Sequence, residues 1–525
     1  MSVAKIYSAQ PHLLTASIIT IEVDLSKGLH AFTIVGLAGK AVDEARDRIS
    51  AAIKNSGWKS PKAKNQKVVI SLAPADIRKD GTGFDLAMAL SYLVAAEEIR
   101  IDNKKKLFIG ELSLDGHVES IKGVLPMIIE AKRKGFTECF VPRDNAIEAA
   151  LVDGITIYPV DTLLETVAHV NEKKSHKDTR EEGEMVITKK YIEPQPKTEL
   201  INKKPNSTHT DIDMSEVKGQ FAAKRGLEIA LAGGHNILMY GPPGTGKTML
   251  ARAAASLLPA LSFEDMLEVT SIYSVHGGAT GSLVTEPPFR APHHTASYVS
   301  IVGGGSTLRP GEVTLAHKGI LFLDEMPEFS TQVLETLREP LEEGKVRISR
   351  ARGSALYPAN FMLIGAMNPC PCGNHGVKGK TCVCSAQYIE RYKRKLSGPI
   401  ADRIDLWVEV WIVEHEKLAD GRQDGETSTE IGKRIQKARD VQKKRYVKEK
   451  ITLNSELSAK HINSLIKLSS ECKDILNQFA KKFDLSARSY HRIIKTARTI
   501  ADLAGGEEIG VEHMHEALQY RPKAY

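Results

Sequence analysis

Cysteine, tryptophan and aromatic residues in general are scarce in this chain of 525 residues. It holds 6 cysteines and 3 tryptophans, and aromatic residues make up 6% of it. So few cysteines over such a length exclude a disulfide-dense secreted scaffold. The longest apolar stretch, around residues 86–96, has about half the length that a membrane-spanning helix needs. The first residues also lack the charged and then apolar layout of a secretory signal. We therefore expect a cytoplasmic protein with no membrane partner.

The overall balance of residue types is that of an ordinary globular protein. Hydrophobic residues make up 42% and charged residues 26% of the chain, which is enough apolar material for several cores. At roughly 150 residues per domain, the length suggests about three or four domains. The formal net charge of +7 is compatible with nucleic-acid binding. A mildly basic solvated surface would give the same charge, so this value does not decide the question.

Composition divides the chain into four parts. The first alternates strand and helix patterns, with strands expected at 67–72 and 106–111 and a helix at 84–93. The second is a polar linker with too few apolar side chains to offset the entropy of ordering, although 185–188 has the composition of a strand. The four parts are residues 1–170, the linker 171–212, residues 213–412 and residues 413–525.

The last part is expected to be mainly helical. Thr427 and Glu430 have the spacing of a capping box, in which the two side chains satisfy the free amides at a helix start. This pattern predicts a helix that begins at about residue 428 and carries many lysines and arginines.

A glycine-rich segment in the third part has the spacing of a phosphate-binding P-loop. It follows an apolar strand at 236–240 and precedes a helical run from residue 249, which is the context that this motif requires. Glycines let backbone amides and the helix N-terminus face phosphates, while Lys247 reaches the β and γ phosphates of ATP and Thr248 ligates Mg²⁺. The segment consists of Gly241, Pro242, Pro243, Gly244, Thr245, Gly246, Lys247 and Thr248.

An apolar run ending in two acids follows about 80 residues later. Residues 320–323 are all apolar, and Asp324 and Glu325 come directly after them. Such a run predicts a buried central strand whose carboxylates emerge at its C-terminal end, where open α/β sheets bind ligands. We expect Asp324 to hold Mg²⁺ and Glu325 to activate the attacking water as the catalytic carboxylate.

Together these motifs resemble the AAA+ ATPases of the magnesium-chelatase-like group, and within it the ComM/YifB family. The resemblance implies an α/β fold: an AAA+ P-loop core with a parallel sheet and flanking helices at 213–412, then a helical lid of the magnesium-chelatase C-terminal type at 413–525. It also implies that an α+β domain like that of Lon protease (S5 domain 2-like) precedes them. The stretches that carry the resemblance are 217–230, 289–295, 337–342, 367–373, 489–492 and 497–503.

The same resemblance assigns three further residues to catalysis. Asn368 matches the sensor-1 position, which orients the attacking water. Arg403 matches the arginine finger, which points into the neighbouring subunit's site, and Arg488 matches sensor 2 on the lid. A guanidinium suits these roles because its fork of donors fits phosphate oxygens as charge develops. The family's ring, a homo-hexamer, follows if Arg403 acts on a neighbour.

The first part resembles the Lon proteolytic domain but lacks its chemistry. Lon-type hydrolysis needs a serine nucleophile activated by a lysine. The nucleophile position aligns with Gly83 and the lysine position falls near Leu125, so both groups are missing. Other serines have no obvious lysine partner apart from Lys122: Ser71, Ser113 and Ser120. We expect a proteolytically inactive domain used for assembly or substrate guidance.

Four of the six cysteines form two short pairs directly after Asn368, namely Cys370, Cys372, Cys382 and Cys384. Four thiolates on two short turns can form the tetrahedral site of structural Zn²⁺. Because Cys-x-Cys is less typical of zinc than Cys-x₂-Cys, free or redox-active thiols and an iron–sulfur cluster remain alternatives. Cys139 and Cys472 are isolated and are expected to be packing residues.

Two segments are candidates for DNA contact. Residues 345–352 alternate basic with small or apolar residues, and a β-hairpin there would present Arg347, Arg350 and Arg352 to phosphates. AAA+ relatives place such a hairpin in the ring pore. The insertion 274–311, with Arg290 and His293–His294, is a second pore candidate, although these side chains can equally be structural.

The function that the resemblance implies is that of an ATP-driven ring motor acting on single-stranded or branched DNA. ComM-like branch migration or helicase activity, in natural transformation or recombination, is the leading hypothesis. The alternatives are the motor subunit of a metal chelatase and a protein-remodelling ATPase.

Overall fold

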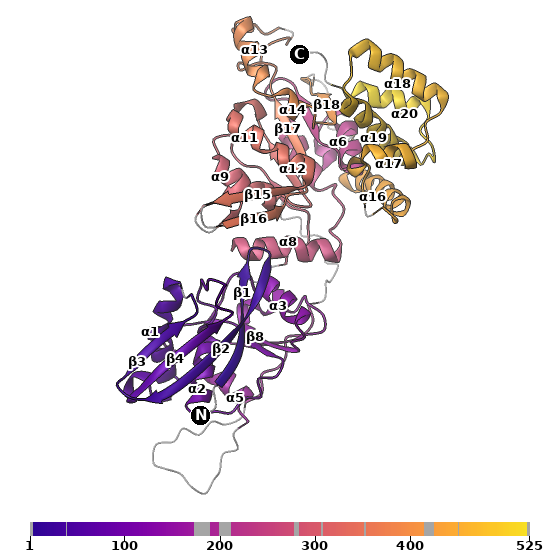
Figure 1. The fold of residues 1–525 in the computed structure, drawn as a ribbon. Helices are drawn as coiled ribbons and strands as arrows, with labels where there is room; N and C mark the ends of the chain where they lie inside the picture. The colour runs from indigo at the N-terminus through magenta and orange to yellow at the C-terminus, as the bar shows by residue number, and fades with distance from the viewer. Residues whose placement is uncertain are drawn as a thin grey trace. The chain divides into compact units, whose positions relative to one another are not determined.

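The structure is a computed structural model of the chain. It describes residues 4–37, 39–172, 190–198, 212–277, 283–305, 308–350, 353–377, 379–413, 425–449 and 451–521. The chain divides into two compact units (Figure 1). Unit 1 comprises Met1–Asn202 and Met266–Val284, and unit 2 comprises Lys203–Asp265 and Thr285–Tyr525. The finer division into four parts remains a prediction from composition.

Unit 1 is built on a four-stranded sheet in the order β1-β2-β4-β3. Strands β3 and β4 run parallel, whereas β1 with β2 and β2 with β4 pair antiparallel. Helices α1 and α2 share one hydrophobic core with this sheet. The bounds are β1 Ala4–His12, β2 Thr15–Lys27, β3 Ala31–Val35, β4 Gln66–Ala73, α1 Lys40–Asn55 and α2 Asp85–Ala95.

A second, three-stranded parallel sheet in the order β5-β8-β9 completes unit 1, together with the short β6–β7 ribbon. Its elements are β5 Lys106–Phe108, β6 Glu111–Leu112, β7 Val118–Glu119, β8 Glu138–Pro142, β9 Thr156–Val160, α3 Val124–Arg133, α4 Ala146–Ala149 and α5 Leu163–Val170. Helix α8, Phe263–His276, joins this unit from Met266 onward.

The strand and helix predicted at 67–72 and 84–93 are present as β4 and α2. The strand predicted at 106–111 is instead broken into β5 and β6 around Gly110. The backbone of Gly110 bonds to Gly83 and Leu86, at 3.0 and 3.1 Å, and so leaves the ladder. The strand predicted at 185–188 lies outside the described residues.

Unit 2 is organised around a five-stranded parallel sheet in the order β11-β14-β17-β10-β18. Every side chain of β14 and β17 is buried, as expected for central strands covered on both faces. Each large apolar side chain buried there contributes roughly 1.5–3 kcal/mol. The bounds are β10 Ile237–Tyr240, β11 Phe289–Arg290, β14 Ile320–Leu323, β17 Met362–Met367 and β18 Leu406–Glu409.

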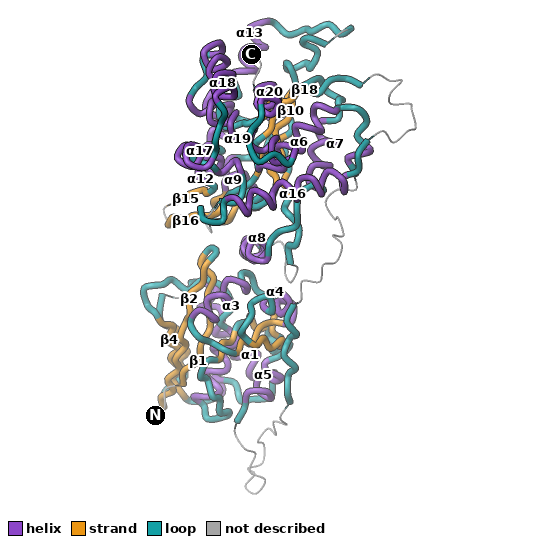
Figure 2. The backbone as a smooth tube through the Cα atoms, turned by 90° about the vertical axis from the view of Figure 1, so that its right-hand side faces the viewer, coloured by secondary structure: helices purple, strands orange, loops and turns teal. Residues whose placement is uncertain are grey.

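The C-terminal helices pack into the same core as this sheet. One continuous cluster of buried side chains joins β10, β17 and α6 to α16 and α19. Figure 2 shows α6 beside strands β10 and β18 of this sheet. The predicted capping box of Thr427 and Glu430 is present at the start of α16. The helices are α6 Phe221–Gly233, α7 Lys247–Ala255, α16 Ser428–Arg445, α17 Ala459–Leu465, α18 Ser470–Phe483, α19 Ala487–Ala504 and α20 Val511–Gln519.

Along the chain, several short elements connect the strands of the parallel sheet. They are α9 Tyr298–Val302, β12 Gly303–Gly304, β13 Arg309–Pro310, α10 Glu312–Leu315, α11 Thr331–Thr336, α12 Arg338–Glu343, β15 Lys345–Arg350, β16 Gly353–Pro358, α13 Ala386–Arg394 and α14 Gly398–Ala401.

The predicted α/β class is confirmed by this architecture. Among the described helices, none combines the length and the apolar character that crossing a bilayer would need.

Candidate functional site

The P-loop connects the end of β10 to the start of α7, as the sequence predicted. Gly244 and Gly246 have φ angles of 77° and 87°, in the left-handed region that glycine adopts without strain. A Cβ on Gly241 would lie 1.9 Å from the carbonyl oxygen of Val410, so a larger residue does not fit there. These positions let the backbone curl around the N-terminus of α7.

The ammonium group of Lys247 is buried against this loop. Its Nζ donates to the carbonyl oxygens of Gly241 and Pro242, both at 2.6 Å. Burial lowers the pKa of Lys247 to about 8, and the charges of Asp324 and Glu325 oppose this shift without cancelling it. A bound anion would raise the pKa of Lys247 again, because a nearby negative charge favours the charged ammonium over the neutral amine.

The two acidic residues after β14 lie next to the P-loop. The Thr248 hydroxyl donates to Asp324 Oδ2 at 2.7 Å, and the Glu325 amide donates to Asp324 Oδ1 at 3.0 Å. Glu325 itself has a φ of 49°, a left-handed conformation that is uncommon for a residue other than glycine. Strain of this kind is often found at functional sites, and here it turns the chain sharply at the strand end.

Asn368 completes the cluster from the strand between these two. Because β17 lies between β10 and β14, the residue after it emerges beside both. Asn368 Oδ1 accepts a hydrogen bond from Lys247 Nζ at 3.2 Å. The structure thus brings together the P-loop, both acids and the predicted sensor-1 residue.

Two contacts at this cluster were not foreseen from the sequence. His294 Nδ1 lies 3.8 Å from Glu325 Oε2, whereas the sequence offers for His294 only a pore role or an unspecified structural one. Gln220, just before α6, donates to the carbonyl oxygens of Thr245 and Trp411, at 3.1 and 2.5 Å. No short motif marks either contact, since both join segments that are distant along the chain.

Arg403 and Arg488 meet on one carboxylate, that of Glu342. Arg403 Nη2 donates to Glu342 Oε2, and its Nη1 donates to the Pro399 carbonyl oxygen at 2.6 Å. Arg488 Nη2 donates to Glu342 Oε1 at 2.8 Å. Among the described residues, no recorded contact joins either arginine to residues 241–248. Their roles as finger and sensor 2 remain predictions.

The four clustered cysteines come together in space. Their sulfur atoms all lie within 4.8 Å of one another, with Cys370 buried and the other three partly exposed. The amides of Asn374 and Val383 donate to Cys372, which lowers its pKa to about 6. Four sulfur donors in such a cluster fit a tetrahedral Zn²⁺ site. The two isolated cysteines, Cys139 and Cys472, are buried, as packing residues would be.

This cysteine loop packs directly against the P-loop. A Cβ on Gly373 would lie 2.4 Å from Cδ of Pro243. Gly373 therefore allows the two loops to touch, and the shape of the cysteine loop bears on the shape of the phosphate-binding loop.

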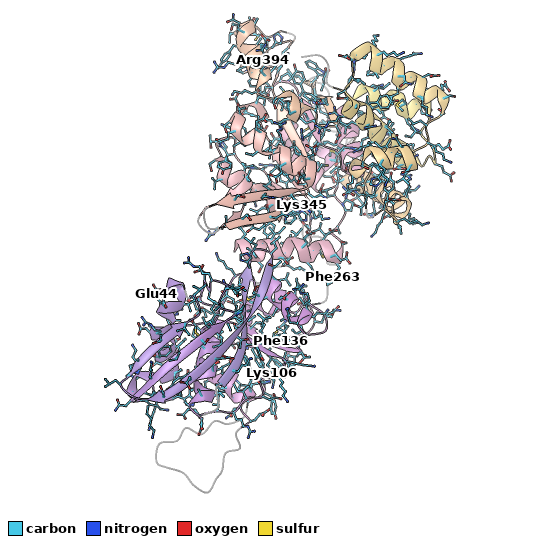
Figure 3. The ribbon with its side chains drawn as sticks, viewed as in Figure 1. Glu44, Lys106, Phe136, Phe263, Lys345 and Arg394 are labelled. Carbon is cyan, nitrogen blue, oxygen red and sulfur yellow. The ribbon has the colours of Figure 1, made fainter. Side chains whose placement is uncertain are left out.

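The predicted hairpin is present as β15 and β16, which pair antiparallel from Lys345 opposite Pro358 to Arg350 opposite Gly353. Val346 and Ile348 are buried, so the alternate residues Lys345 and Arg347 are exposed on the other face. Figure 3 labels Lys345 at the start of this hairpin. Arg352 and the side chain of Arg350 lie outside what the structure describes.

The second pore candidate, 274–311, is not one continuous loop. Its beginning up to Val284 belongs to unit 1, whereas Arg290 lies on edge strand β11 of the unit 2 sheet. Arg290 also forms a two-pronged ion pair with Glu312, at 2.6 and 2.8 Å. The guanidinium of Arg290 is therefore engaged with a carboxylate, whereas the side chain of Arg347 is exposed.

In unit 1, a cavity of about 360 Å³ lies at the position aligned with the Lon nucleophile. Gly83, Ser120 and Lys122 line it. None of the hydrogen bonds recorded for the described residues joins the Ser120 hydroxyl to Lys122. Leu125, at the lysine position of Lon, is fully buried in α3. The residues present do not form the serine–lysine pair that hydrolysis needs.

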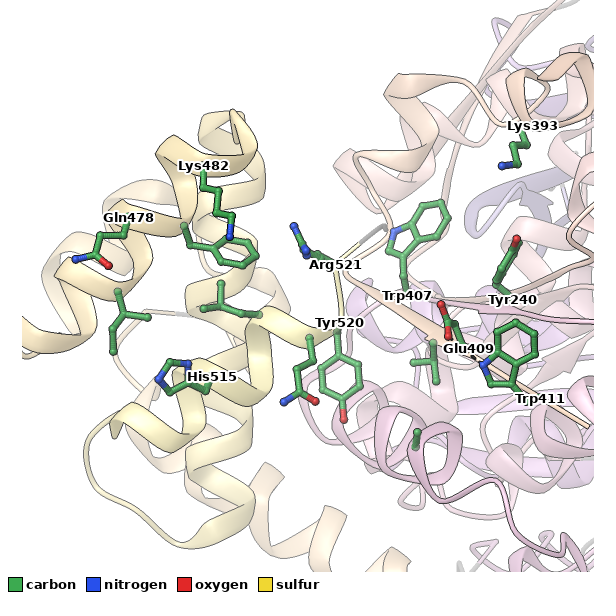
Figure 4. A pocket seen from close by; sticks show the side chains of 16 residues that line it. Tyr240, Lys393, Trp407, Glu409, Trp411, Gln478, Lys482, His515, Tyr520 and Arg521 are labelled. Atoms are coloured by element: carbon green, nitrogen blue, oxygen red, sulfur yellow. Dashed lines mark hydrogen bonds between the residues drawn. The ribbon is translucent and has the colours of Figure 1, made fainter. Parts of the chain in front are cut away.

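A larger cavity, of about 1110 Å³, lies in unit 2 between β18 and the C-terminal helices (Figure 4). Trp407, Trp411 and Tyr520 line it, together with the basic side chains of Lys482 and Arg521. Lys247, Asp324 and Glu325 are not among its lining residues, whereas Tyr240, which directly precedes the P-loop, is.

Three family models match the chain. The model for "Magnesium chelatase, subunit ChlI" matches residues 213–418, "Subunit ChlI of Mg-chelatase" matches 21–145, and "Magnesium chelatase, subunit ChlI C-terminal" matches 425–521. A weaker similarity extends to Lon protease of Leptospira interrogans, which is 24% identical over 214 residues, 39% of this chain and 25% of that protein.

Several relatives match along nearly the entire chain, among them a ComM and a YifB protein. Competence protein ComM of Haemophilus influenzae is 40% identical over 524 residues, which cover 99% of this chain and 98% of that protein. YifB of Escherichia coli is 39% identical over 523 residues, 99% of this chain and 97% of that protein. With the P-loop, the paired acids and Asn368 gathered at one edge of a parallel sheet, the chain belongs to the ComM/YifB family of magnesium-chelatase-like AAA+ ATPases.

Proposed function

We propose that this protein is a Mg²⁺-dependent ATPase whose subunits form a ring that moves on DNA and drives branch migration or strand separation. The observation that carries the ATPase proposal is the cluster of four residues in which Lys247 donates to Asn368 and Thr248 donates to Asp324. The name of the Haemophilus influenzae relative, a competence protein, supports a role with DNA.

The cluster supplies the groups that phosphoryl transfer to water requires. Lys247 would exchange its two carbonyl partners for the β and γ phosphates, which bind an ammonium more strongly because they are charged. Glu325 would accept a proton from the attacking water, and Asn368 would hold that water in line. The Glu325 carboxylate lies 3.8 Å from Nδ1 of His294 and close enough to Lys247 to oppose the lowering of its pKa, which supports this role.

Thr248 and Asp324 are the residues that would hold Mg²⁺. Both offer hard oxygen ligands, and their side chains already lie within hydrogen-bonding distance at 2.7 Å. The ion would neutralise charge on the β and γ phosphates. The cysteine cluster would hold a structural Zn²⁺, which would stiffen the loop that rests on Pro243.

Ring formation follows from the role proposed for Arg403. If its guanidinium acts on the neighbouring subunit's nucleotide, a lone chain has no complete site, and a homo-hexamer is the assembly expected. Arg347 on β15 would then contact DNA phosphates together with Arg350 and Arg352. Unit 1 would serve assembly or substrate guidance, because among the described residues no hydrogen bond joins Ser120 to Lys122 in its cavity.

A metal-chelatase motor is the second candidate, favoured by the matches to the magnesium-chelatase subunit models. One experiment separates the candidates. The ATPase rate is measured alone and with single-stranded DNA, branched DNA, a porphyrin with Mg²⁺, or an unfolded protein. We expect stimulation by DNA; stimulation by the porphyrin or the protein alone would overturn the proposal.

A further inference from the structure

The two arginines predicted to serve hydrolysis are both bound by Glu342, on α12. Each oxygen of this carboxylate takes one guanidinium: Oε2 accepts from Arg403 and Oε1 from Arg488. The three residues come from distant parts of the chain, since Arg488 lies 146 positions after Glu342. The Glu342 carboxylate thus binds both guanidinium groups, which are the two groups proposed to bind phosphate oxygens.

Arg403 is held back in this arrangement. Its side chain is only 10% exposed, and its second Nη donates to the carbonyl oxygen of Pro399. Its Nε has no hydrogen-bond partner among the described residues. A finger that acts on another subunit must project from the surface, so Arg403 has to leave Glu342 before it can work.

Glu342 also lies next to the candidate DNA hairpin. Helix α12 ends at Glu343, Gly344 caps it with a φ of 63°, and β15 begins at Lys345. The carboxylate is thus separated by only two residues from the strand that carries Arg347. A shift of this strand would move the end of α12, because only Gly344 separates the two elements and they also contact each other.

We propose that Glu342 is a latch that withholds Arg403 and Arg488 from the nucleotide until DNA engages the β15–β16 hairpin. This inference rests on the proposed function, because it assumes that the two arginines serve hydrolysis. In the latched state the carboxylate stands in for phosphate oxygens as the partner of both guanidinium groups. When DNA binds the hairpin and shifts it, Glu342 moves, and both arginines become available to bind phosphate. Glu342 is therefore a positioning residue, which acts on the reaction through the arginines.

Substitution of Glu342 by Gln removes the charge and keeps the shape. A partly exposed ion pair of this kind changes an equilibrium constant by only a small factor. We therefore expect the ATPase rate without DNA to rise about three- to tenfold when the pairs with Glu342 are weakened. The apparent KM for ATP should fall, because phosphate no longer competes with the carboxylate. The ratio of the rates with and without DNA should shrink towards one. Glu342→Asp, which keeps the charge, should behave more like the unchanged chain.

Glu343→Gln is the matched control. Glu343 is an exposed neighbour of Glu342, so its substitution removes one negative charge from the same end of α12 and leaves the carboxylate that binds the two arginines in place. The second control is Glu342→Gln in an Arg403→Ala chain. If Glu342 acts through Arg403, most of the rise in rate disappears there, whereas a general loosening of α12 would persist.

The latch is refuted if Glu342→Gln slows hydrolysis without DNA, or changes it no more than Glu343→Gln does. Failure of the proposed function looks different. A chain that DNA does not stimulate would defeat the DNA motor, while a faster Glu342→Gln variant in the same assay would still support the latch on the arginines.

Discussion

Thr248 and Asp324 lie 76 positions apart in the chain, yet the hydroxyl of one donates to the carboxylate of the other at 2.7 Å. Their contact joins the P-loop to the end of strand β14, at the nucleotide site that we propose. The C-terminal ends of parallel strands lie at one edge of the sheet, so the order of the strands is sufficient to bring Thr248 and Asp324 together.

Lys247→Ala and Glu325→Gln should have contrasting effects. Lys247 would hold phosphates, so its loss should weaken ATP binding at least tenfold, by about 1.4 kcal/mol or more. Glu325 would act only on the attacking water, so Glu325→Gln should bind ATP normally and lose nearly all turnover. Equilibrium binding and steady-state hydrolysis measure the two effects. Wild-type turnover by Glu325→Gln would remove Glu325 from the mechanism.

ATP affinity should depend on pH through Lys247. With a pKa of about 8, the ammonium is half deprotonated at this pH, mostly charged below it and mostly neutral above it. Phosphate binding favours the charged form, so binding above pH 8 must take up a proton. The ATP dissociation constant should therefore rise with pH, approaching about tenfold per unit. Titrations from pH 7 to 9.5 test this, and Lys247→Ala should abolish this component of the slope. A flat profile would contradict it.

Metal analysis should find about one zinc per chain, lost when Cys370 and Cys382 are both replaced by Ser. Because Gly373 rests on Pro243, losing the metal should also weaken ATP binding. Cys139→Ser is a control for loss of a thiol outside the cluster. Four titratable thiols in folded, zinc-free protein would exclude the structural site, and a brown chromophore would favour an iron–sulfur cluster.

Arg403→Ala should bind ATP but hydrolyse it poorly, because each pocket would lack its neighbour's guanidinium. Mixing this variant with Lys247→Ala should restore part of the activity. In mixed rings some pockets pair an intact P-loop with an intact finger. The ATPase rate across mixing ratios measures this rescue. Inactive mixtures in which mixed rings are seen to form would exclude a finger acting between subunits.

Replacing Arg347 and Arg350 together by Ala should abolish most of the stimulation by branched DNA. Fewer cations would contact phosphates, so the dependence of DNA affinity on salt concentration should also flatten. For each variant, the ATPase rate with branched DNA is compared with the rate of the same variant without DNA. Arg290→Ala is a comparison variant, and it should affect DNA affinity less because Arg290 is paired with Glu312. Unchanged stimulation and salt dependence would remove the hairpin from the DNA site.

Local sequence was sufficient for the P-loop, the acidic strand end, the capping box at Thr427 and the Lys345–Arg350 strand. In each case the signal lies within a few neighbouring residues, where spacing and side-chain type already define the backbone geometry. The same holds for the cysteine pairs. Resemblance to a family supplied the candidate roles of Asn368, Arg403 and Arg488, for which no local pattern is sufficient.

Only the tertiary structure decided which distant residues meet. The contacts of His294 with Glu325, of Gly373 with Pro243, and of Glu342 with both arginines join segments that no periodicity connects. The break at Gly110 likewise follows from hydrogen bonds to a loop outside the strand. Sequence patterns report the conformation of a segment, because they record which of its faces is apolar. The pairing of side chains across the fold depends on how whole elements pack, so it appears only once the sheet and its helices are assembled.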